Sequence, residues 1–187
     1  MGLRRVSVIG FCLAAVAAVV MLAAVIIRPP KIYISEICPS NSETSKKTAM
    51  QDKNGEPSDW IEIYNPTNKD ISLTGFSLSK NGGGDQPLGG YVIKAHDYII
   101  VYCSSAGFEN ADFPHADFSI GKVSEAEIIL KYDSFQCESI KMPKLNKGVS
   151  YSKNVKGEMY VSEPTSCGEC RENYRRYTCV FSGGRQL

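Results

Sequence analysis

Acidic and amide side chains gather in the loop sequence DKNGEPSD, residues 52–59, and could bind a metal ion. Asp52, Asn54 and Asp59 would supply the carboxylate and amide oxygens that Ca²⁺ prefers. Their spacing does not follow that of an EF-hand loop, and turns rich in Asx residues are common without a metal. Calcium is therefore a weak hypothesis for these three residues, and the sequence predicts no other cofactor.

Catalysis by paired acidic residues or by a histidine has little support. Asp59 and Glu62 are three residues apart in a predicted strand, so their side chains point to opposite faces of the sheet. General acid–base chemistry by two carboxylates requires that they share a site. The two histidines, His96 and His115, are isolated from each other and lie in no catalytic motif. We expect a protein that is not an enzyme.

Six of the seven cysteines follow residue 28, and this even number permits disulfides if the region lies outside the cytosol. Buried free thiols are the alternative, and the sequence does not rank the connectivities. Cys167 and Cys170 have the spacing of a redox or half-zinc motif, but no histidine or second close pair accompanies them. We favour a local disulfide staple there. The disulfide candidates are Cys38, Cys103, Cys137, Cys167, Cys170 and Cys179.

The run Val6–Ile27 contains no charge and no proline. As a helix it would be about 33 Å long, enough to cross the roughly 30 Å hydrocarbon core of a bilayer. A cleaved signal peptide, a lipoprotein anchor at Cys12 and a buried core helix are the alternatives. The run is longer than the apolar core of a signal peptide and ends without a small-residue cleavage site. We therefore predict a transmembrane signal anchor over residues 6–27.

The flanks of this run set its expected orientation. Arg4 and Arg5 precede it, whereas Arg28 and Lys31 follow it, so the local charge count is nearly balanced. The short N-terminal tail favours a cytoplasmic position for residues 1–5 and an outside position for the long C-terminal part. The prediction is a single-pass cell-membrane protein with a linker at residues 28–31 and its C-terminal domain outside the cytoplasm.

The C-terminal segment, residues 169–187, combines basic and aromatic residues. Arg171, Arg175 and Arg176 lie among tyrosines and could contact anionic lipid head groups or an acidic wall polymer. A solvated tail is the alternative. The net charge of the whole chain is only +1, and binding to phosphates needs a concentrated basic surface, so we expect no nucleic-acid partner.

Between the predicted anchor and the tail, short extended runs alternate with turn-forming residues. Many of these runs alternate apolar and polar side chains, as half-buried strands do, and none keeps helical periodicity over three turns. The pattern predicts about nine short strands in an all-β antiparallel sandwich or barrel, one of them at Phe118–Ile120. We expect Asn81–Gly90, with five glycines, to be a loop, and Asp133-Ser134 to be a hairpin turn.

The order of these pieces resembles the lamin tail domain family. The resemblance is carried by IYISEICPSN, residues 32–41, by DKNGEPSDWIEIYNPTNKDISLTGFSLS, residues 52–79, and by later pieces that end with SEPTSCG, residues 162–168. It implies an immunoglobulin-like β-sandwich over residues 32–168, of the bacterial membrane-anchored type. Ser166-Cys167 stands where the family pattern has Pro-Gly, so the closing turn departs from that pattern.

Within this resemblance, the acidic and aromatic residues are interpreted as supports of the fold. Trp60 is the largest apolar side chain and is expected to fill the space between two sheets. Glu62 would point the same way as Trp60 and would need hydrogen-bond partners if buried. Asp59 would accept hydrogen bonds from nearby backbone amides, while Asn65 and Gly75 would shape turns. The signature residues are Glu36, Asp59, Trp60, Glu62, Tyr64, Asn65 and Gly75.

Two functions remain open. The preferred hypothesis is a membrane-anchored, non-enzymatic module that binds an extracellular protein or wall polymer through loops of a rigid sandwich. The alternative is an accessory subunit that presents a surface hydrolase or kinase partner to its substrate. The filament role of nuclear lamins is not supported, because their tail follows a long heptad rod and this chain has a predicted membrane span there.

Overall fold

The computed structural model describes residues 29–39, 41, 57–104, 114–121 and 125–164. These residues form twelve β-strands and no helix, which agrees with the predicted all-β class. None of them forms a helix that could span a membrane, and the predicted anchor at residues 6–27 lies outside the described part. All strands belong to the unit Lys31–Leu187. They are β1 (Tyr33–Cys38), β2 (Asp59–Tyr64), β3 (Ile71–Ser72), β4 (Phe76–Lys80), β5 (Gln86–Pro87), β6 (Val92–Ile93), β7 (Tyr98–Cys103), β8 (His115–Ala116), β9 (Ala126–Tyr132), β10 (Phe135–Met142), β11 (Ser150–Lys153) and β12 (Met159–Ser162).

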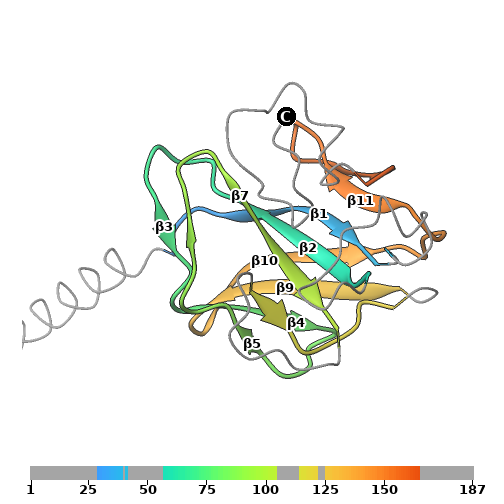
Figure 1. Cartoon of the computed structure of the whole chain (residues 1–187), viewed down its shortest axis with the longest axis horizontal. Helices are drawn as coiled ribbons and strands as arrows, with labels where there is room; N and C mark the ends of the chain where they lie inside the picture. The colour runs from blue at the N-terminus through green and yellow to red at the C-terminus, as the bar shows by residue number, and fades with distance from the viewer. Residues whose placement is uncertain (1–28, 40, 42–56, 105–113, 122–124, 165–187) are drawn as a thin grey trace, which may run out of the picture. The chain divides into compact units, whose positions relative to one another are not determined.

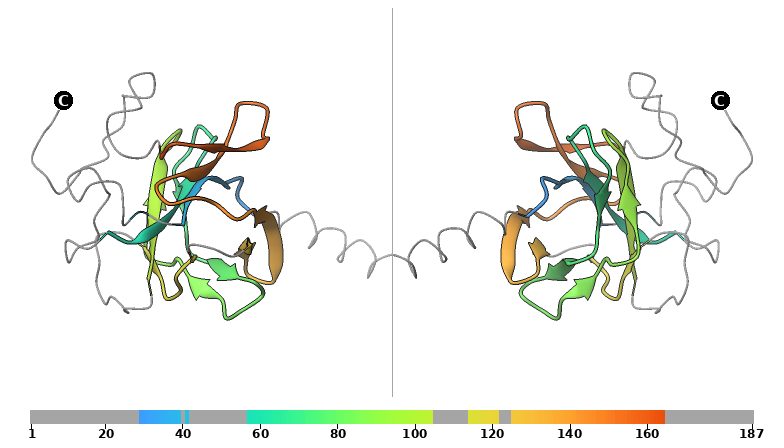
Figure 2. Two further views of the ribbon diagram at one scale, coloured as in Figure 1. Left: turned by 90° about the vertical axis from the view of Figure 1, so that its right-hand side faces the viewer. Right: turned by 90° about the vertical axis from the view of Figure 1, so that its left-hand side faces the viewer.

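Two sheets form the main layers of this unit. The six-stranded sheet has the order β12-β11-β1-β2-β7-β8, and the four-stranded sheet has the order β10-β9-β4-β5. The two sheets face each other in Figure 1 and in the side views of Figure 2. β3 and β6 form a separate two-stranded sheet. This layered, all-β arrangement is consistent with an immunoglobulin-like sandwich.

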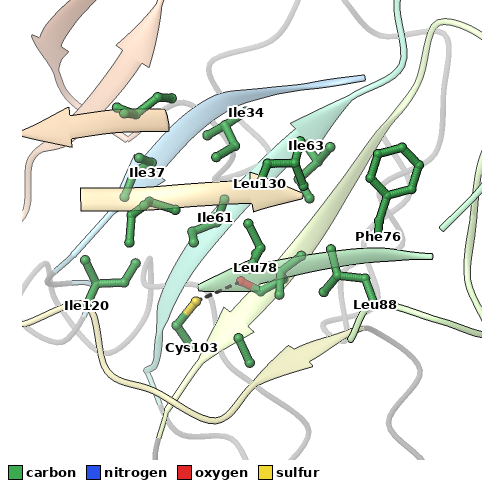
Figure 3. Close-up of a cluster of buried hydrophobic side chains, with 14 of the residues drawn as sticks. Ile34, Ile37, Ile61, Ile63, Phe76, Leu78, Leu88, Cys103, Ile120 and Leu130 are labelled. Carbon is green, nitrogen blue, oxygen red and sulfur yellow. Dashed lines mark hydrogen bonds between the residues drawn. The ribbon is translucent and has the colours of Figure 1, made fainter. Parts of the chain in front are cut away.

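The hydrophobic core lies between the two sheets (Figure 3). Ile61 and Ile63 of β2 point into it, as do Phe76 and Leu78 of β4, because alternate residues of a strand share one face. Removing such a large side chain from water stabilises the fold by about 1.5–3 kcal/mol. The core members are Ile32, Ile34, Ile37, Ile61, Ile63, Ile71, Leu73, Phe76, Leu78, Leu88, Ile93, Val101, Cys103, Ala116, Ile120, Ala126, Ile128, Leu130, Ile140, Met142 and Leu145.

A β-bulge in β1 adjusts this alternation. Ile34 and Ile37 both lie in the core although three positions separate them. The pairing of β1 with β2 shifts register between Ile34 and Glu36, so the extra residue, Ser35, re-aims the side chains that follow. The irregular spacing in the sequence IYISEIC therefore has a structural cause.

The structure corrects three sequence expectations. The strand lies at β8, His115–Ala116, rather than at Phe118–Ile120, and it pairs with β7 in parallel, so the sandwich is not purely antiparallel. The Asn81–Gly90 segment is not only a loop, because β5 pairs with β4 there. Its apolar residue Leu88 is fully buried and donates its backbone N–H to Phe76 O at 2.8 Å. Tertiary pairing overrides the loop-forming composition here.

The hairpin between β9 and β10 turns at Asp133-Ser134, as predicted. Asp133 has a φ of 49° and donates its backbone N–H to Gly75 O at 2.7 Å. Gly75 itself has a φ of 87°, and a Cβ there would lie 3.1 Å from both Asp133 Oδ1 and Tyr132 Cε2. Glycine is therefore required at position 75 for two reasons, the backbone conformation and the close approach of the hairpin.

Candidate functional site

The carboxylate of Asp59, the first residue of β2, accepts hydrogen bonds from residues 119–121, a segment distant in the chain. Its Oδ2 accepts hydrogen bonds from Ser119 Oγ at 3.0 Å, from Ile120 N at 2.9 Å and from Gly121 N at 3.2 Å. Lys80 Nζ donates to Ser119 O at 2.8 Å and holds the same segment from β4. Asp59 thus supports the fold, and these three partners lie some sixty residues away in the chain.

Trp60 occupies a different place from the one predicted. It is fully buried, yet it belongs to a second, smaller cluster with Cys38, Ile100 and Tyr102, on the face of the six-stranded sheet that points away from the main core. Ile61 and Ile63 take the face between the sheets, so the alternation of β2 sends Trp60 to the other side. The expectation that Trp60 fills the space between the sheets is wrong.

Glu36 and Glu62 lie opposite each other on this same outer face. They are Cα partners in the β1–β2 ladder, and each residue is only 1% exposed. Ser35 Oγ donates to Glu62 Oε1 at 2.6 Å, which supplies one of the hydrogen bonds that a buried carboxylate requires. The sequence placed Glu62 beside Trp60 correctly but could not pair it with Glu36, because the strand register is set by tertiary contacts.

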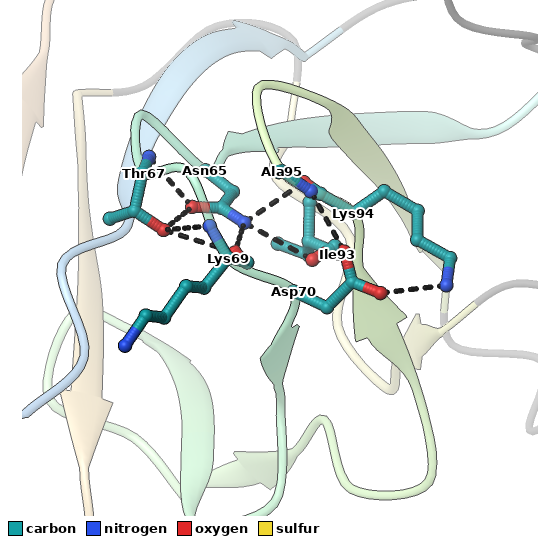
Figure 4. A network of polar contacts seen from close by, with 7 residues as sticks. All are labelled: Asn65, Thr67, Lys69, Asp70, Ile93, Lys94 and Ala95. Atoms are coloured by element: carbon teal, nitrogen blue, oxygen red, sulfur yellow. Dashed lines mark hydrogen bonds and ion pairs between the residues drawn. The ribbon is translucent and has the colours of Figure 1, made fainter.

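Asn65 organises the loops that follow β2 and precede β7 (Figure 4). Its Nδ2 donates to Lys69 O at 2.7 Å, to Lys94 O at 2.9 Å and to Ile93 O at 3.2 Å, and its Oδ1 accepts from Thr67 N at 2.9 Å and from Thr67 Oγ1 at 2.7 Å. The side chain is fully buried, so these bonds satisfy groups that water cannot reach. The predicted turn role of Asn65 extends across two loops.

A salt bridge closes the same pair of loops at the surface. Lys94 Nζ lies 2.7 Å from Asp70 Oδ2, and Ala95 N donates to Asp70 Oδ1 at 3.1 Å. The hydrogen bond with Lys94, followed by that from Ala95, lowers the pKa of the Asp70 carboxyl group. Both side chains are largely exposed, so this pair adds little stability beside the buried bonds of Asn65.

One serine and one histidine meet at the end of β7. Ser104 Oγ and His115 Nε2 are 2.9 Å apart, a contact that sequence reasoning missed because β8 was not foreseen. Ser104 N also donates to Ala116 O at 3.2 Å, so the contact belongs to the pairing of β7 with β8.

Residues 28–138 match the family model described as Lamin Tail Domain. The match covers more than half of the chain and contains all seven signature residues predicted from the sequence. The chain belongs to the lamin tail domain family. No curated protein matches the chain. In this lamin tail domain, strands β1 to β9 and the start of β10 lie inside the matched residues, and the β11–β12 hairpin lies beyond them.

Several predicted site residues of this lamin tail domain lie outside the described part. Asp59 is the one described member of the calcium hypothesis, and three donors already engage its Oδ2. Among the described residues, no three His, Cys, Asp or Glu side chains cluster as a metal site. The calcium hypothesis stays a prediction, because Asp52 and Asn54 lie outside the described part. The predicted residues that lie outside this part are Asp52, Asn54, Cys167, Cys170, Cys179, Arg171, Arg175 and Arg176.

Cys103 and Cys137 of the lamin tail domain carry free thiols, so the structure does not show the disulfides considered for them. Cys103 is buried in the main core, and Cys137 on β10 is partly exposed. Burial raises the pKa of the Cys103 thiol well above its ordinary value, and the Asp59 carboxylate raises it further. The Cys103 thiol therefore stays protonated and unreactive at neutral pH.

The exposed apolar residues of the lamin tail domain concentrate at its β11–β12 hairpin. Val155 at the tip is 95% exposed, and Tyr160 and Val161 of β12 are 45% and 55% exposed. Val92 and Phe135 are exposed at other places in the fold. Three of the five exposed large apolar residues of the described part therefore lie within seven residues of one hairpin, with Tyr160 and Val161 on opposite faces of β12.

Proposed function

We propose that this lamin tail domain is a non-enzymatic recognition module of the bacterial membrane-anchored type. Residues 6–27 would hold it in the cell membrane as a single-pass anchor, and the sandwich would lie outside the cytoplasm. There it would bind an extracellular protein or a wall polymer. The apolar run Val6–Ile27 supports the anchor, since its length matches a bilayer core.

The fold combines loops held by buried hydrogen bonds with exposed segments, and this contrast supports the recognition part of the proposal. Buried polar side chains such as Asn65 fasten neighbouring loops to the backbone of the sandwich. By contrast, the Asn81–Gly90 segment and the β11–β12 hairpin offer exposed backbone and apolar side chains. Recognition residues commonly lie on loops that a rigid scaffold positions.

The location is tested with an epitope tag after Leu187 in living cells. External protease should remove the tag from intact cells and leave a cytoplasmic control protein untouched. Protection of the tag in intact cells, together with its loss in opened cells, would show that the domain lies inside and would overturn the proposed location.

The recognition role is tested by cross-linking on the same intact cells. We expect a specific protein or wall polymer to be captured, and the capture to fall when Gly82–Gly84 is replaced by three prolines. Substitution of the exposed Lys69 by serine serves as the control, since it lies in the loop between β2 and β3 and should leave the capture unchanged. Capture of a hydrolase or kinase would overturn the recognition role and favour the accessory-subunit alternative.

A further inference from the structure

Strand β12 ends the six-stranded sheet. It pairs with β11 from Ser150↔Ser162 to Lys153↔Met159, and no described strand lies on its other side. A strand in this position presents unpaired backbone N–H and C=O groups, which can template the addition of another strand.

The turn of the hairpin shows which backbone groups face the open side. Asn154 N donates to Glu158 O at 2.9 Å, which marks these two residues as a hydrogen-bonded pair. Hydrogen-bonded pairs alternate along an antiparallel ladder, so Tyr160 bonds to β11, whereas the backbone groups of Met159 and Val161 point away from it. The open side of β12 therefore offers the donors and acceptors of Met159 and Val161 to a further strand.

The edge strand β10 carries protective features that the sequence of β12 lacks. β10 contains a bulge between Gln136 and Glu138, and Glu138 ties this strand to the opposite sheet by accepting from Ile34 N at 2.7 Å and by pairing with Lys153. β12, with the sequence MYVS, has no charge, no proline and no register shift. Charges, prolines and bulges are the usual devices that prevent pairing at a sheet edge.

The charges beside β12 indicate the chemistry of its partner. Glu158 precedes the strand and Glu163 follows it, and both are exposed. We propose that β12 binds an extended segment of a partner protein by strand addition, and that this segment carries an apolar centre between basic residues. The proposal rests on the proposed recognition function and names the surface and the class of partner. Basic flanks would face the two glutamates, while the apolar centre would cover Tyr160 and Val161.

A second copy of this chain is the alternative occupant of the edge. Because only the backbone groups of Met159 and Val161 face the open side, two antiparallel β12 strands would pair Val161 with Val161 and Met159 with Glu163. Such a pair places no basic residue opposite either glutamate, whereas a partner segment with basic flanks does. The charge pattern therefore favours the basic-flanked segment.

The test uses the full chain in detergent micelles and a fluorescent synthetic peptide, Lys-Arg-Val-Tyr-Val-Thr-Arg-Lys, with binding followed by anisotropy. Val161→Pro removes the backbone donor on the open side of β12 without removing a bond to β11, and proline is tolerated at sheet edges. Asp117→Ala is the control, because Asp117 is exposed and follows β8, at the opposite edge of the six-stranded sheet.

We expect Val161→Pro to weaken peptide binding about tenfold, the effect of one lost backbone hydrogen bond and its neighbours, and Asp117→Ala to leave binding unchanged. The double variant Glu158→Lys with Glu163→Lys should instead prefer a peptide with glutamate flanks. Circular dichroism establishes that each variant keeps its β-structure, and the charge reversal tests the site even if Val161→Pro does not fold.

Three results would overturn the inference. They are no binding of the peptide to the unaltered chain, equal binding by the folded Val161→Pro variant, and indifference to the charge of the flanks. Sedimentation of the unaltered chain in the same micelles adds a fourth, because a dimer that Val161→Pro dissociates would identify a second copy as the occupant. None of these results bears on the protease test of location, so the two proposals fail separately.

Discussion

Asp59 Oδ2 accepts a hydrogen bond from Ile120 N at 2.9 Å and so joins two residues that are 61 positions apart in the chain. Asp59 begins β2 in the six-stranded sheet, and Ile120 is a fully buried core residue beyond β8. The carboxylate therefore fixes the position at which the segment after β8 enters the core. A charged acceptor that serves three donors is a stronger tie than a single neutral hydrogen bond.

Replacement of this carboxylate should lower stability. Asp59→Ala leaves the donors of Ser119, Ile120 and Gly121 without their acceptor, and we expect the free energy of unfolding to fall by about 2 kcal/mol. Urea denaturation followed by the fluorescence of Trp60, the single tryptophan, measures the change. Asp117→Ala, at an exposed position, is the control and should have no effect. Equal losses in the two variants would contradict the assignment.

Three glycines separate the effect of backbone conformation from that of crowding. Gly75→Ala meets both a φ of 87° and contacts at 3.1 Å, whereas Gly90→Ala has a φ of 89° in open space and Gly89→Ala has neither restriction. We expect Gly90→Ala to cost about 1–2 kcal/mol, Gly75→Ala to cost more, and Gly89→Ala to be neutral. Thermal or urea unfolding gives the order. If Gly75→Ala were as stable as Gly90→Ala, the β9–β10 hairpin would have moved to accommodate the new Cβ without loss of unfolding free energy.

Loss of the Asn65 side chain should destabilise both loops that it bonds. Asn65→Ala leaves the carbonyl groups of Lys69, Ile93 and Lys94 without their donor, and we expect a loss of about 2–3 kcal/mol of unfolding free energy. Asp70→Asn weakens the exposed salt bridge in the same loops and should change stability little. Amide hydrogen exchange should rise in residues 65–70 and 93–97 of Asn65→Ala alone. Uniform exchange across the domain would point to global unfolding instead.

The buried thiol of Cys103 should make stability fall at alkaline pH. Its folded pKa is raised by burial, so the unfolded thiol ionises first as the pH rises beyond its ordinary pKa. The unfolded state then gains free energy of ionisation that the folded state lacks, and the stability present at neutral pH declines toward the folded pKa. Cys103→Ala should flatten the decline of unfolding free energy above about pH 8.5. An unchanged slope relative to the unaltered chain would contradict this account.

Local sequence pattern predicts much of the strand content of this lamin tail domain. Alternating residues in DWIEIY give β2, and Asp133-Ser134 gives the β9–β10 turn, because side-chain alternation and turn conformations depend on a few adjacent residues. The same alternation correctly places Glu62 and Trp60 on one face. Alternation alone does not determine which face of β2 is turned to the main core. The prediction that Trp60 lies on the core-facing side was therefore wrong.

Pairing between distant strands is the part that only the tertiary structure decides. The opposition of Glu36 and Glu62, the bond from Ile120 to Asp59 and the parallel pairing of β8 all depend on register and on segments far apart in the chain. A shift of one residue exchanges the two faces of a strand, and local propensity does not distinguish these registers. The family signature and the all-β class thus follow from the sequence itself. Which face of a strand is buried and which strand it pairs with are decided by packing between the two sheets.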